Sequence, residues 1–225
     1  MRIIAGTRKG HTIYAPKGME TRPTGDRVRE AAFNLIGPVD GASVLDLYAG
    51  SGAMGLEALS RGADRAVFVE SDRDASRGIE RNLEKLGLTG ARVVCDDVLR
   101  FLASERGSYD LILVDPPYEM VESLQMRLSH YLPALLAENG LVVFETSARD
   151  EPELPLAQRT SRRYGSARLT LFEHFSRSSG PTGGSGPEGI VLGTAPESTG
   201  PPVGSGGSGG RLRRPGGAAG EGREE

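Results

Sequence analysis

A glycine-rich turn is the first group of residues whose types and spacing could perform chemistry. Gly50, Gly52 and Gly55 follow the apolar run Ser43–Tyr48 and open a helical pattern. Glycines in such a turn let the backbone approach a ligand closely, but enzymes that bind dinucleotides share this spacing. Asp46 separates the two interpretations, because a carboxylate at this end of the strand would repel the pyrophosphate of NAD. It suits a ligand with a cationic end, such as the amino group or the sulfonium of S-adenosylmethionine.

Two further apolar runs also end in acidic residues. Glu70 lies twenty residues after Gly50, where its carboxylate could accept hydrogen bonds from both hydroxyls of a ribose. Asp97 follows the third run and could accept a hydrogen bond from the amino group of adenine. Either carboxylate alone would fit a helix cap or a solvated loop better. Together with Asp46 they favour a nucleoside with a cationic tail. The predicted contacts of this ligand are Asp46, Gly50, Ser51, Gly52, Glu70 and Asp97.

The second candidate site is the tetrapeptide Asp115-Pro116-Pro117-Tyr118, which directly follows the apolar run Leu111–Val114. Consecutive prolines fix the backbone and remove two hydrogen-bond donors, so nearby carbonyl groups are free to accept. The Asp115 carboxylate and the Pro116 carbonyl could hold both N–H groups of an exocyclic amine, and Tyr118 could stack on its base. Because the methyl donor is already activated, positioning would supply most of the catalysis, and Asp115 could take the released proton. The alternative is a turn that ends the strand and packs its tyrosine.

Alternating strands and helices would bring these residues to one edge of a sheet. The apolar runs predict strands at Ser43–Tyr48, Ala66–Glu70, Ala91–Cys95, Tyr109–Val114 and Leu141–Glu145. Helical patterns separate them at Ala53–Arg61, at Arg73–Leu86, from Asp97 onward and at Leu124–Leu136. Continuous apolar strands between helices indicate a parallel sheet covered on both faces, a doubly wound α/β domain whose strand ends line the ligand crevice.

The two flanks of this region differ from its middle. After the fifth strand, Gln158–Tyr164 and Ala167–His174 predict two neighbouring strands with a turn between them, so the parallel sheet would finish in an antiparallel hairpin. Before the first core strand, the pattern predicts a short strand pair, Arg2–Ala5 with His11–Tyr14, and a helix at about Asp26–Leu35.

Composition sets off the last fifty residues, which hold half of the 32 glycines, six of the 14 prolines and no aromatic residue. So few large apolar groups cannot offset the entropy lost on ordering, and we predict a disordered tail over residues 176–225. The net charge of −3 excludes a globally basic protein, although residues 1–40 carry seven basic and four acidic side chains. A single cysteine, Cys95, excludes an internal disulfide, and we interpret it as a small core residue. Without a signal peptide or a membrane-spanning run we expect a cytoplasmic protein, and we predict no metal site.

Several segments are similar to the RsmD family of class I methyltransferases. They are Arg2–Gly6, Arg22–Asn34, Asp46–Ala63 and Tyr164-Gly165. The tetrapeptide Asp115–Tyr118 resembles the signature of the amino-methylating branch of this class. The similarity covers roughly residues 1–175, although Gly25 stands where the family usually has another residue. It implies a Rossmann-like, mostly parallel seven-stranded sheet that ends in an antiparallel hairpin, with a small N-terminal extension.

The same resemblance implies a function. S-adenosylmethionine would be the methyl donor, and the exocyclic N2 of a guanine in 16S ribosomal RNA, free or within an assembling small subunit, would be the target. Asp46, Gly50, Gly52, Glu70 and Asp97 would then bind the cofactor, and Asp115 to Tyr118 would handle the target base. Residues 41–175 would form the methyltransferase domain and residues 1–40 an extension that contacts RNA. We expect a monomer.

Basic residues of the extension are candidates for contacts with RNA phosphates: Arg8, Lys9, Arg22, Arg27 and Arg29. Alternatively, Arg27 and Arg29 form salt bridges that hold the predicted helix to the sheet. Other functions remain open, namely an amino methyltransferase that acts on DNA adenine or cytosine, on another RNA or on a glutamine side chain, and a non-catalytic RNA-binding protein with this fold. Glutamine methylation is usually associated with Asn at the position of Asp115, and Asp46 disfavours a nucleotide-dependent oxidoreductase.

Overall fold

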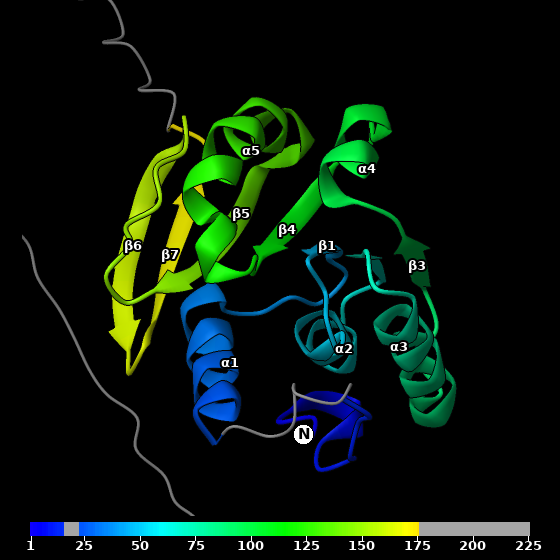
Figure 1. The fold of residues 1–225 in the computed structure, drawn as a ribbon. Coiled ribbons are helices and arrows are strands. Elements are labelled where there is room, and N and C mark those ends of the chain that lie inside the picture. The colour runs from blue at the N-terminus through cyan, green and yellow to red at the C-terminus, as the bar shows by residue number, and fades with distance from the viewer. Residues whose placement is uncertain (16–22, 176–225) are drawn as a thin grey trace, which may run out of the picture. The chain divides into compact units, whose positions relative to one another are not determined.

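A computed structural model describes residues 1–15 and 23–175 of the chain. Within them lies a seven-stranded sheet with the strand order β3-β2-β1-β4-β5-β7-β6 (Figure 1). The strands are β1 Ser43–Leu47, β2 Arg65–Glu70, β3 Ala91–Cys95, β4 Tyr109–Val114, β5 Leu136–Ser147, β6 Ala157–Tyr164 and β7 Ala167–Glu173. Neighbouring strands are parallel except β7, which runs antiparallel to both β5 and β6. This confirms the predicted α/β sheet with its terminal antiparallel hairpin.

Helices cover both faces of the sheet, with α1, α2 and α3 on one face and α4 and α5 on the other (Figure 1). The helices are α1 Pro23–Ile36, α2 Ala53–Ser60, α3 Arg73–Leu86, α4 Val98–Ser104 and α5 Val121–Leu135, with short 3-10 turns at η1 Gly6–Arg8 and η2 Tyr118–Met120. Successive residues of a strand face opposite sides, so Val44 packs under α1 to α3 while Leu45 packs under α4 and α5. The central strands are therefore apolar along most of their length, with Asp46 of β1 and Asp110 of β4 as exceptions, and their runs were visible in the sequence.

Local signals explain where individual helices begin and end. The Asp72 carboxylate accepts a hydrogen bond from the Ala75 backbone N–H at 2.7 Å, which caps the start of α3. Gly87 ends the same helix with a φ of 58°, a left-handed conformation that glycine adopts without strain. The predicted bounds of this helix, Arg73–Leu86, are therefore confirmed.

Three sequence predictions need correction. The expected strand pair at the N-terminus forms one isolated bridge, Arg2 to Thr12, because η1 turns the chain between its two halves. The fifth core strand begins at Leu136, earlier than predicted, because Leu136 directly follows α5 and already pairs with Tyr109 of β4. An irregularity separates this pair from the pairing of Leu111 with Leu141, and residues 137–140 carry no apolar pattern. Cys95 is exposed, since β3 is an edge strand and is only partly covered.

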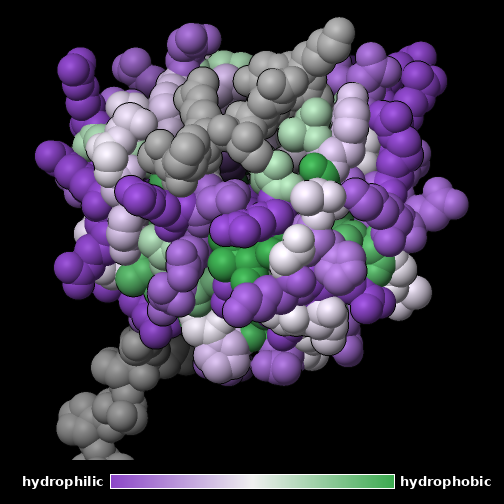
Figure 2. Space-filling view, turned by 90° about the horizontal axis from the view of Figure 1, so that it is seen from below, coloured by the Kyte–Doolittle hydropathy of each residue, from purple (hydrophilic) through white to green (hydrophobic). Residues whose placement is uncertain are grey.

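The N-terminal segment packs against the same core as the sheet. Ile3 and Ile13 are buried in the hydrophobic cluster that also contains Phe33 of α1 and Leu56 of α2. In Figure 1 this segment lies next to α2, on the face away from α4 and α5. Figure 2, which looks at the molecule from below the view of Figure 1, shows a mostly hydrophilic outline around a small hydrophobic area.

Some predictions concern residues outside the described part of the structure. Arg22 and the predicted tail over residues 176–225 lie outside the described ranges. In the ranges 1–15 and 23–175, no helix has both the length and the apolar character that crossing a bilayer requires.

Candidate active site

The carboxyl ends of the central strands bring the predicted site residues together. Leu47 of β1 pairs with Val69 of β2 on one side and with Val114 of β4 on the other. Glu70 and Asp115 each lie one residue beyond these partners, so both stand at the same edge as Asp46. The chain leaves β1 toward β2 and later returns to the other side of β1 as β4. Strand order therefore reverses here, and the resulting crevice is where open α/β sheets bind ligands.

Backbone hydrogen bonds to two carboxylates fix the glycine-rich turn. The Gly50 N–H donates to Glu70 Oε2 at 2.8 Å, and the Gly55 N–H donates to Asp46 Oδ2 at 2.9 Å. Gly50 and Gly52 have φ values of 54° and 75°, a region that favours glycine. A side chain at Gly55 would overlap the ring of Phe68, so this glycine permits close packing of α2 on β2. The turn is thus shaped before any ligand binds.

Asp46 is a buried carboxyl with an excess of negative charge around it. Its side chain is only 3% exposed, and its pKa rises to about 8, chiefly because burial disfavours the charged form. The hydrogen bond from Gly55 opposes this shift, whereas the charges of Asp115 and Glu70 add to it. A cationic group placed beside Asp46 would restore its charged form. This group of carboxyl oxygens therefore suits a ligand with a positively charged end.

Tyr48 was not predicted from the sequence as a site residue, and its hydroxyl is a second indication that a polar ligand binds here. Its hydroxyl oxygen is buried and has no hydrogen-bond partner among the described residues. Its φ of 59° is strained for a residue other than glycine, and such strain often accompanies functional turns. Burial, followed by the charge of Asp97, raises the pKa of this hydroxyl above its ordinary range. A buried, unpaired donor near Asp97 fits a nucleoside that supplies the missing acceptor. The unusual φ of Tyr48 has no sequence signal.

Asp97 fulfils the alternative role considered for it, without excluding the predicted one. Its Oδ1 accepts a hydrogen bond from the Arg100 N–H at 3.0 Å and so caps α4. The cap uses one carboxylate oxygen, and the residue is exposed. The side chain stands at the start of α4, after β3 and near the Tyr48 hydroxyl, where an adenine amino group could reach the second oxygen.

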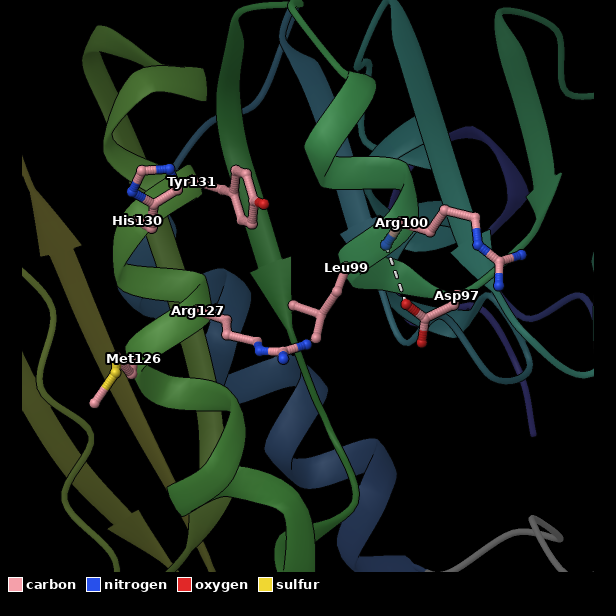
Figure 3. Close-up of a pocket in the computed structure, with 7 residues that line it drawn as sticks. All are labelled: Asp97, Leu99, Arg100, Met126, Arg127, His130 and Tyr131. Atoms are coloured by element: carbon pink, nitrogen blue, oxygen red, sulfur yellow. Dashed lines mark hydrogen bonds between the residues drawn. The ribbon is translucent and has the colours of Figure 1, made fainter.

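A groove of about 570 Å³ between α4 and α5 opens beside Asp97 (Figure 3). Its lining consists of Asp97, Leu99, Arg100, Met126, Arg127, His130 and Tyr131. Arg127 extends from α5 toward Leu99 of α4, whereas Met126 points away from it. Neither Asp46 nor Asp115 lines this groove, which therefore borders the candidate site and is not its centre.

The Asp115–Tyr118 tetrapeptide lies at the adjoining end of β4. Asp115 is reachable by solvent, but surrounding protein atoms reduce its hydration and raise its pKa to about 6. Pro116 is buried, whereas Tyr118 begins η2 with 43% of its surface exposed. An aromatic face and a carboxylate are therefore presented together at the crevice, as the sequence predicts.

Glu145 joins this end of the site, although the sequence reading placed no role on it. Val114 of β4 pairs with Phe144 of β5, so Glu145 stands across from Asp115 on the neighbouring strand. Burial and then the charge of Asp115 raise the pKa of Glu145 to about 8, while a hydrogen bond with Tyr118 opposes the shift. The sequence did hold a signal for Glu145, because this acidic residue ends an apolar run. Glu70 ends another such run, and Asp97 lies just after a third.

The prediction that Arg29 contacts RNA is wrong. Its side chain is 4% exposed, and its guanidinium pairs with Asp26 at 3.0 Å and with Glu57 at 3.7 Å. It also donates to the Arg2 carbonyl at 2.6 Å. These contacts hold α1 and the N-terminal segment to α2. The alternative that the sequence left open is therefore right in that Arg29 forms salt bridges, but the partners lie on helices and not on the sheet, and Arg27 is exposed. The partner Glu57 lies 28 residues further along the chain, so the sequence pattern did not reveal the pair.

The remaining basic candidates are more accessible. Lys9 and Arg27 are exposed. Arg8 is half-buried, and its Nη2 donates to the Gly87 carbonyl at 3.2 Å, while its Nε is buried and has no partner among the described residues. Lys9, Arg27 and part of Arg8 therefore remain available to a polyanion.

The strand order, the antiparallel β7 and the glycine turn after β1 define the class I S-adenosylmethionine-dependent methyltransferases. Within that class, the family model described as "Conserved hypothetical protein 95" matches residues 1–173. The chain therefore belongs to this family, the RsmD family that the sequence motifs resemble.

Named relatives agree with this assignment. The Ribosomal RNA small subunit methyltransferase D of Escherichia coli (strain K12) is 44% identical over 119 residues, which are 52% of this chain and 60% of that protein. The protein of the same name from Haemophilus influenzae is 32% identical over 162 residues, 68% of this chain and 81% of that protein. A hypothetical protein of Thermus thermophilus has a solved structure that is 35% identical. It aligns with a TM-score of 0.66 over 77% of this chain and 99% of that one.

Proposed function

We propose that this protein transfers the methyl group of S-adenosylmethionine to the exocyclic N2 of a guanine in small-subunit ribosomal RNA. One observation carries the proposal: the Asp115–Tyr118 tetrapeptide stands at the same sheet edge as the buried Asp46 and the glycine turn. A cofactor site and an amine-holding site would therefore adjoin. The names of the relatives support an RNA of the small ribosomal subunit as the substrate.

Residues of the first, second and third strand ends would hold the cofactor. Asp46 would accept the cationic amino group, and the backbone of Gly50 to Gly52, including Ser51, would lie against the methionine portion. Glu70 would accept hydrogen bonds from the ribose hydroxyls, and Asp97 would accept one from the adenine amino group. Bound there, S-adenosylmethionine supplies a methyl group on a positively charged sulfur, which needs no further activation.

The tetrapeptide would hold the target base after it leaves its stack. Tyr118 offers an exposed ring for stacking, and the Asp115 carboxylate with the Pro116 carbonyl would accept the two amine N–H groups. Pro117 keeps this backbone rigid. The bond from sulfur to methyl breaks as the bond from nitrogen to methyl forms, and the nitrogen then loses a proton. Asp115, with a pKa of about 6, is mostly charged at neutral pH and can accept that proton.

Residues 1–40 would guide the RNA toward this site. Lys9 and Arg27 are exposed cations, and Arg8 is partly so, which suits contacts with phosphates. Arg22 belongs to the same proposal but lies outside the described residues. In this division residues 41–175 carry the chemistry, and residues 1–40 contribute affinity for RNA.

Methylation of small ribosomal subunits from a bacterial strain that lacks this activity tests the proposal. The purified protein and S-adenosylmethionine are added, and the modified nucleotide is identified by mass spectrometry. Appearance of N2-methylguanosine at a single site supports reaction and substrate together. Incorporation into adenine, cytosine, DNA or protein instead would keep the fold and refute the assigned target.

A further inference from the structure

Glu145 brings a second carboxyl group to the end of the site that faces the target base. The pairing of Val114 with Phe144 places Asp115 and Glu145 at equivalent positions on neighbouring parallel strands. Adjacent strands lie about 4.8 Å apart. The charge of Asp115 acts directly on Glu145, so the two carboxyl groups are near neighbours.

Tyr118 fixes where the Glu145 side chain lies. The tyrosine hydroxyl donates a hydrogen bond to the Glu145 carboxylate, so the proposed stacking ring and this carboxylate are joined. Glu145 is half-buried and belongs to a strand position that pairs with Leu169 of β7. Its carboxylate is therefore held at the edge of the stacking surface and does not extend freely into solvent.

We propose that Glu145 is a further substrate-binding residue, which accepts the ring N1–H of the target guanine while Asp115 and the Pro116 carbonyl hold its N2. This inference rests on the proposed function, because it assigns a second edge of the same base. The amino group of guanine lies beside a ring N–H, whereas that of adenine or cytosine lies beside a ring nitrogen with a lone pair. A carboxylate at this point attracts the first arrangement and repels the second.

The electrostatics of the pair agree with this role. With the pKa values of Asp115 and Glu145 raised to about 6 and about 8, the site without ligand holds about one proton on the two groups near neutral pH. An N–H donor favours the charged form of Glu145, so the retained proton leaves as guanine enters. Three acceptors, Glu145, Asp115 and the Pro116 carbonyl, then face three N–H groups of the base.

Two substrates that share the exocyclic amine but differ at N1 and at C6 of the base provide the test. The nucleotide that the wild-type protein modifies is first mapped. A synthetic RNA fragment with guanine or 2-aminopurine at that position is then ligated into the small-subunit RNA. 2-Aminopurine keeps the exocyclic amine but lacks O6 and has a lone pair in place of the N1–H. The loss of O6 is the same for every variant, so the change in preference between variants reports on the N1 position. Single-turnover rates are measured for the wild-type protein and for the Glu145→Ala, Glu145→Gln and Tyr118→Phe variants. Thermal unfolding and S-adenosylmethionine binding show that each variant is folded.

The wild-type protein should prefer guanine over 2-aminopurine by at least about tenfold, the value of one hydrogen bond to a charged group. Glu145→Ala should slow guanine methylation and reduce this preference. Glu145→Gln should retain much of the guanine rate, because its carbonyl oxygen still accepts the N1–H. It should nevertheless discriminate less, because its amide can turn and donate to the lone pair of 2-aminopurine. Tyr118→Phe keeps the carboxylate but removes the hydrogen bond that holds it, so it should reduce the preference less than Glu145→Ala does.

A preference that survives Glu145→Ala unchanged would overturn the inference. So would equal slowing by Glu145→Ala and Tyr118→Phe on both substrates, since Glu145 would then act only by holding the tyrosine. Failure of the proposed function gives a different result. In that case the wild-type protein modifies another base or another molecule, and no guanine nucleotide can be mapped at all.

Discussion

The two ends of the candidate site differ in how their carboxylates are used. At the cofactor end, Asp46 and Glu70 are buried and accept hydrogen bonds from backbone N–H groups of the glycine turn. At the target-base end, Asp115 is reachable by solvent and Glu145 is shared with Tyr118. The first end is organised by the protein itself, whereas the second keeps its acceptors for a substrate. Carboxylates at the first end therefore shape the turn as well as offering acceptors to the cofactor, whereas those at the second end are offered to the target base.

The strongest challenge to this comparison is Asp115→Ala. Because Asp115 would hold and deprotonate the amine, we expect the single-turnover rate to fall by about 1000-fold. The dissociation constant for S-adenosylmethionine, measured by calorimetry, should stay nearly unchanged. Asp115→Asn retains an acceptor and should lose less activity. Equal loss of cofactor binding would place Asp115 at the wrong end of the site.

The contrast between bonded and open residues recurs in α1, where Arg29 and Arg27 lie two positions apart. Arg29→Ala removes a cation from the buried Glu57 and should lower the free energy of unfolding by about 3 kcal/mol. Arg27→Ala should leave that free energy nearly unchanged but reduce the salt dependence of RNA binding by about one unit of slope. Urea unfolding and RNA titrations at several salt concentrations measure the two effects. An unaltered slope for Arg27→Ala would remove it from the RNA surface.

At the cofactor end, Asp46→Asn separates the charge of this side chain from its hydrogen bond to the turn. The amide oxygen can still accept from the Gly55 N–H, so the turn keeps its shape while the charge is lost. We expect S-adenosylmethionine to bind about 30-fold more weakly, within the range for one hydrogen bond to a charged group. The rate at saturating cofactor should change far less. Unchanged binding would show that Asp46 only supports the turn.

The pH dependence of the methylation rate reports on the protonation of Asp115, and its expected effect is smaller than those of the substitutions above. A raised pKa means that Asp115 stays protonated, and thus a poor acceptor, to a higher pH than an ordinary aspartate. At saturating cofactor the single-turnover rate should therefore rise about tenfold from pH 5 to pH 7, with a midpoint near 6. Asp115→Asn should remove the midpoint near 6 and leave the titration of Glu145. A midpoint near that of an ordinary aspartate would argue that Asp115 is fully hydrated.

Much of the fold was predictable because each central strand is apolar on both faces and each acidic strand end interrupts that pattern. The bounds of α3 and β4, for example, agree with prediction. The reduction of the predicted N-terminal strand pair to one bridge was not predictable, because η1 depends on how residues 6–8 pack beside Ser60 in three dimensions.

Site residues were predictable where a reactive side chain stands next to a recognisable local pattern, such as the end of an apolar run. Asp46, Glu70 and Asp115 follow directly from strand ends, and the structure brings them to one edge. Glu145 was missed because its place beside Asp115 depends on the strand order, which makes β5 the neighbour of β4. Arg29 was misassigned for a related reason, since a charge near the N-terminus does not reveal which distant carboxylate it faces.

Glu57 has a consequence for how this sequence can change over generations. Its buried carboxylate accepts the backbone N–H groups of Ile4 and Ala5 at 2.8 and 2.9 Å, and it pairs with Arg29 and Arg61. An apolar replacement there would leave the two backbone donors without their acceptor and would remove one carboxylate from each of the two cations. Drift at positions 29, 57 and 61 must therefore be concerted. Among naturally occurring variants we expect these three positions to change together or not at all.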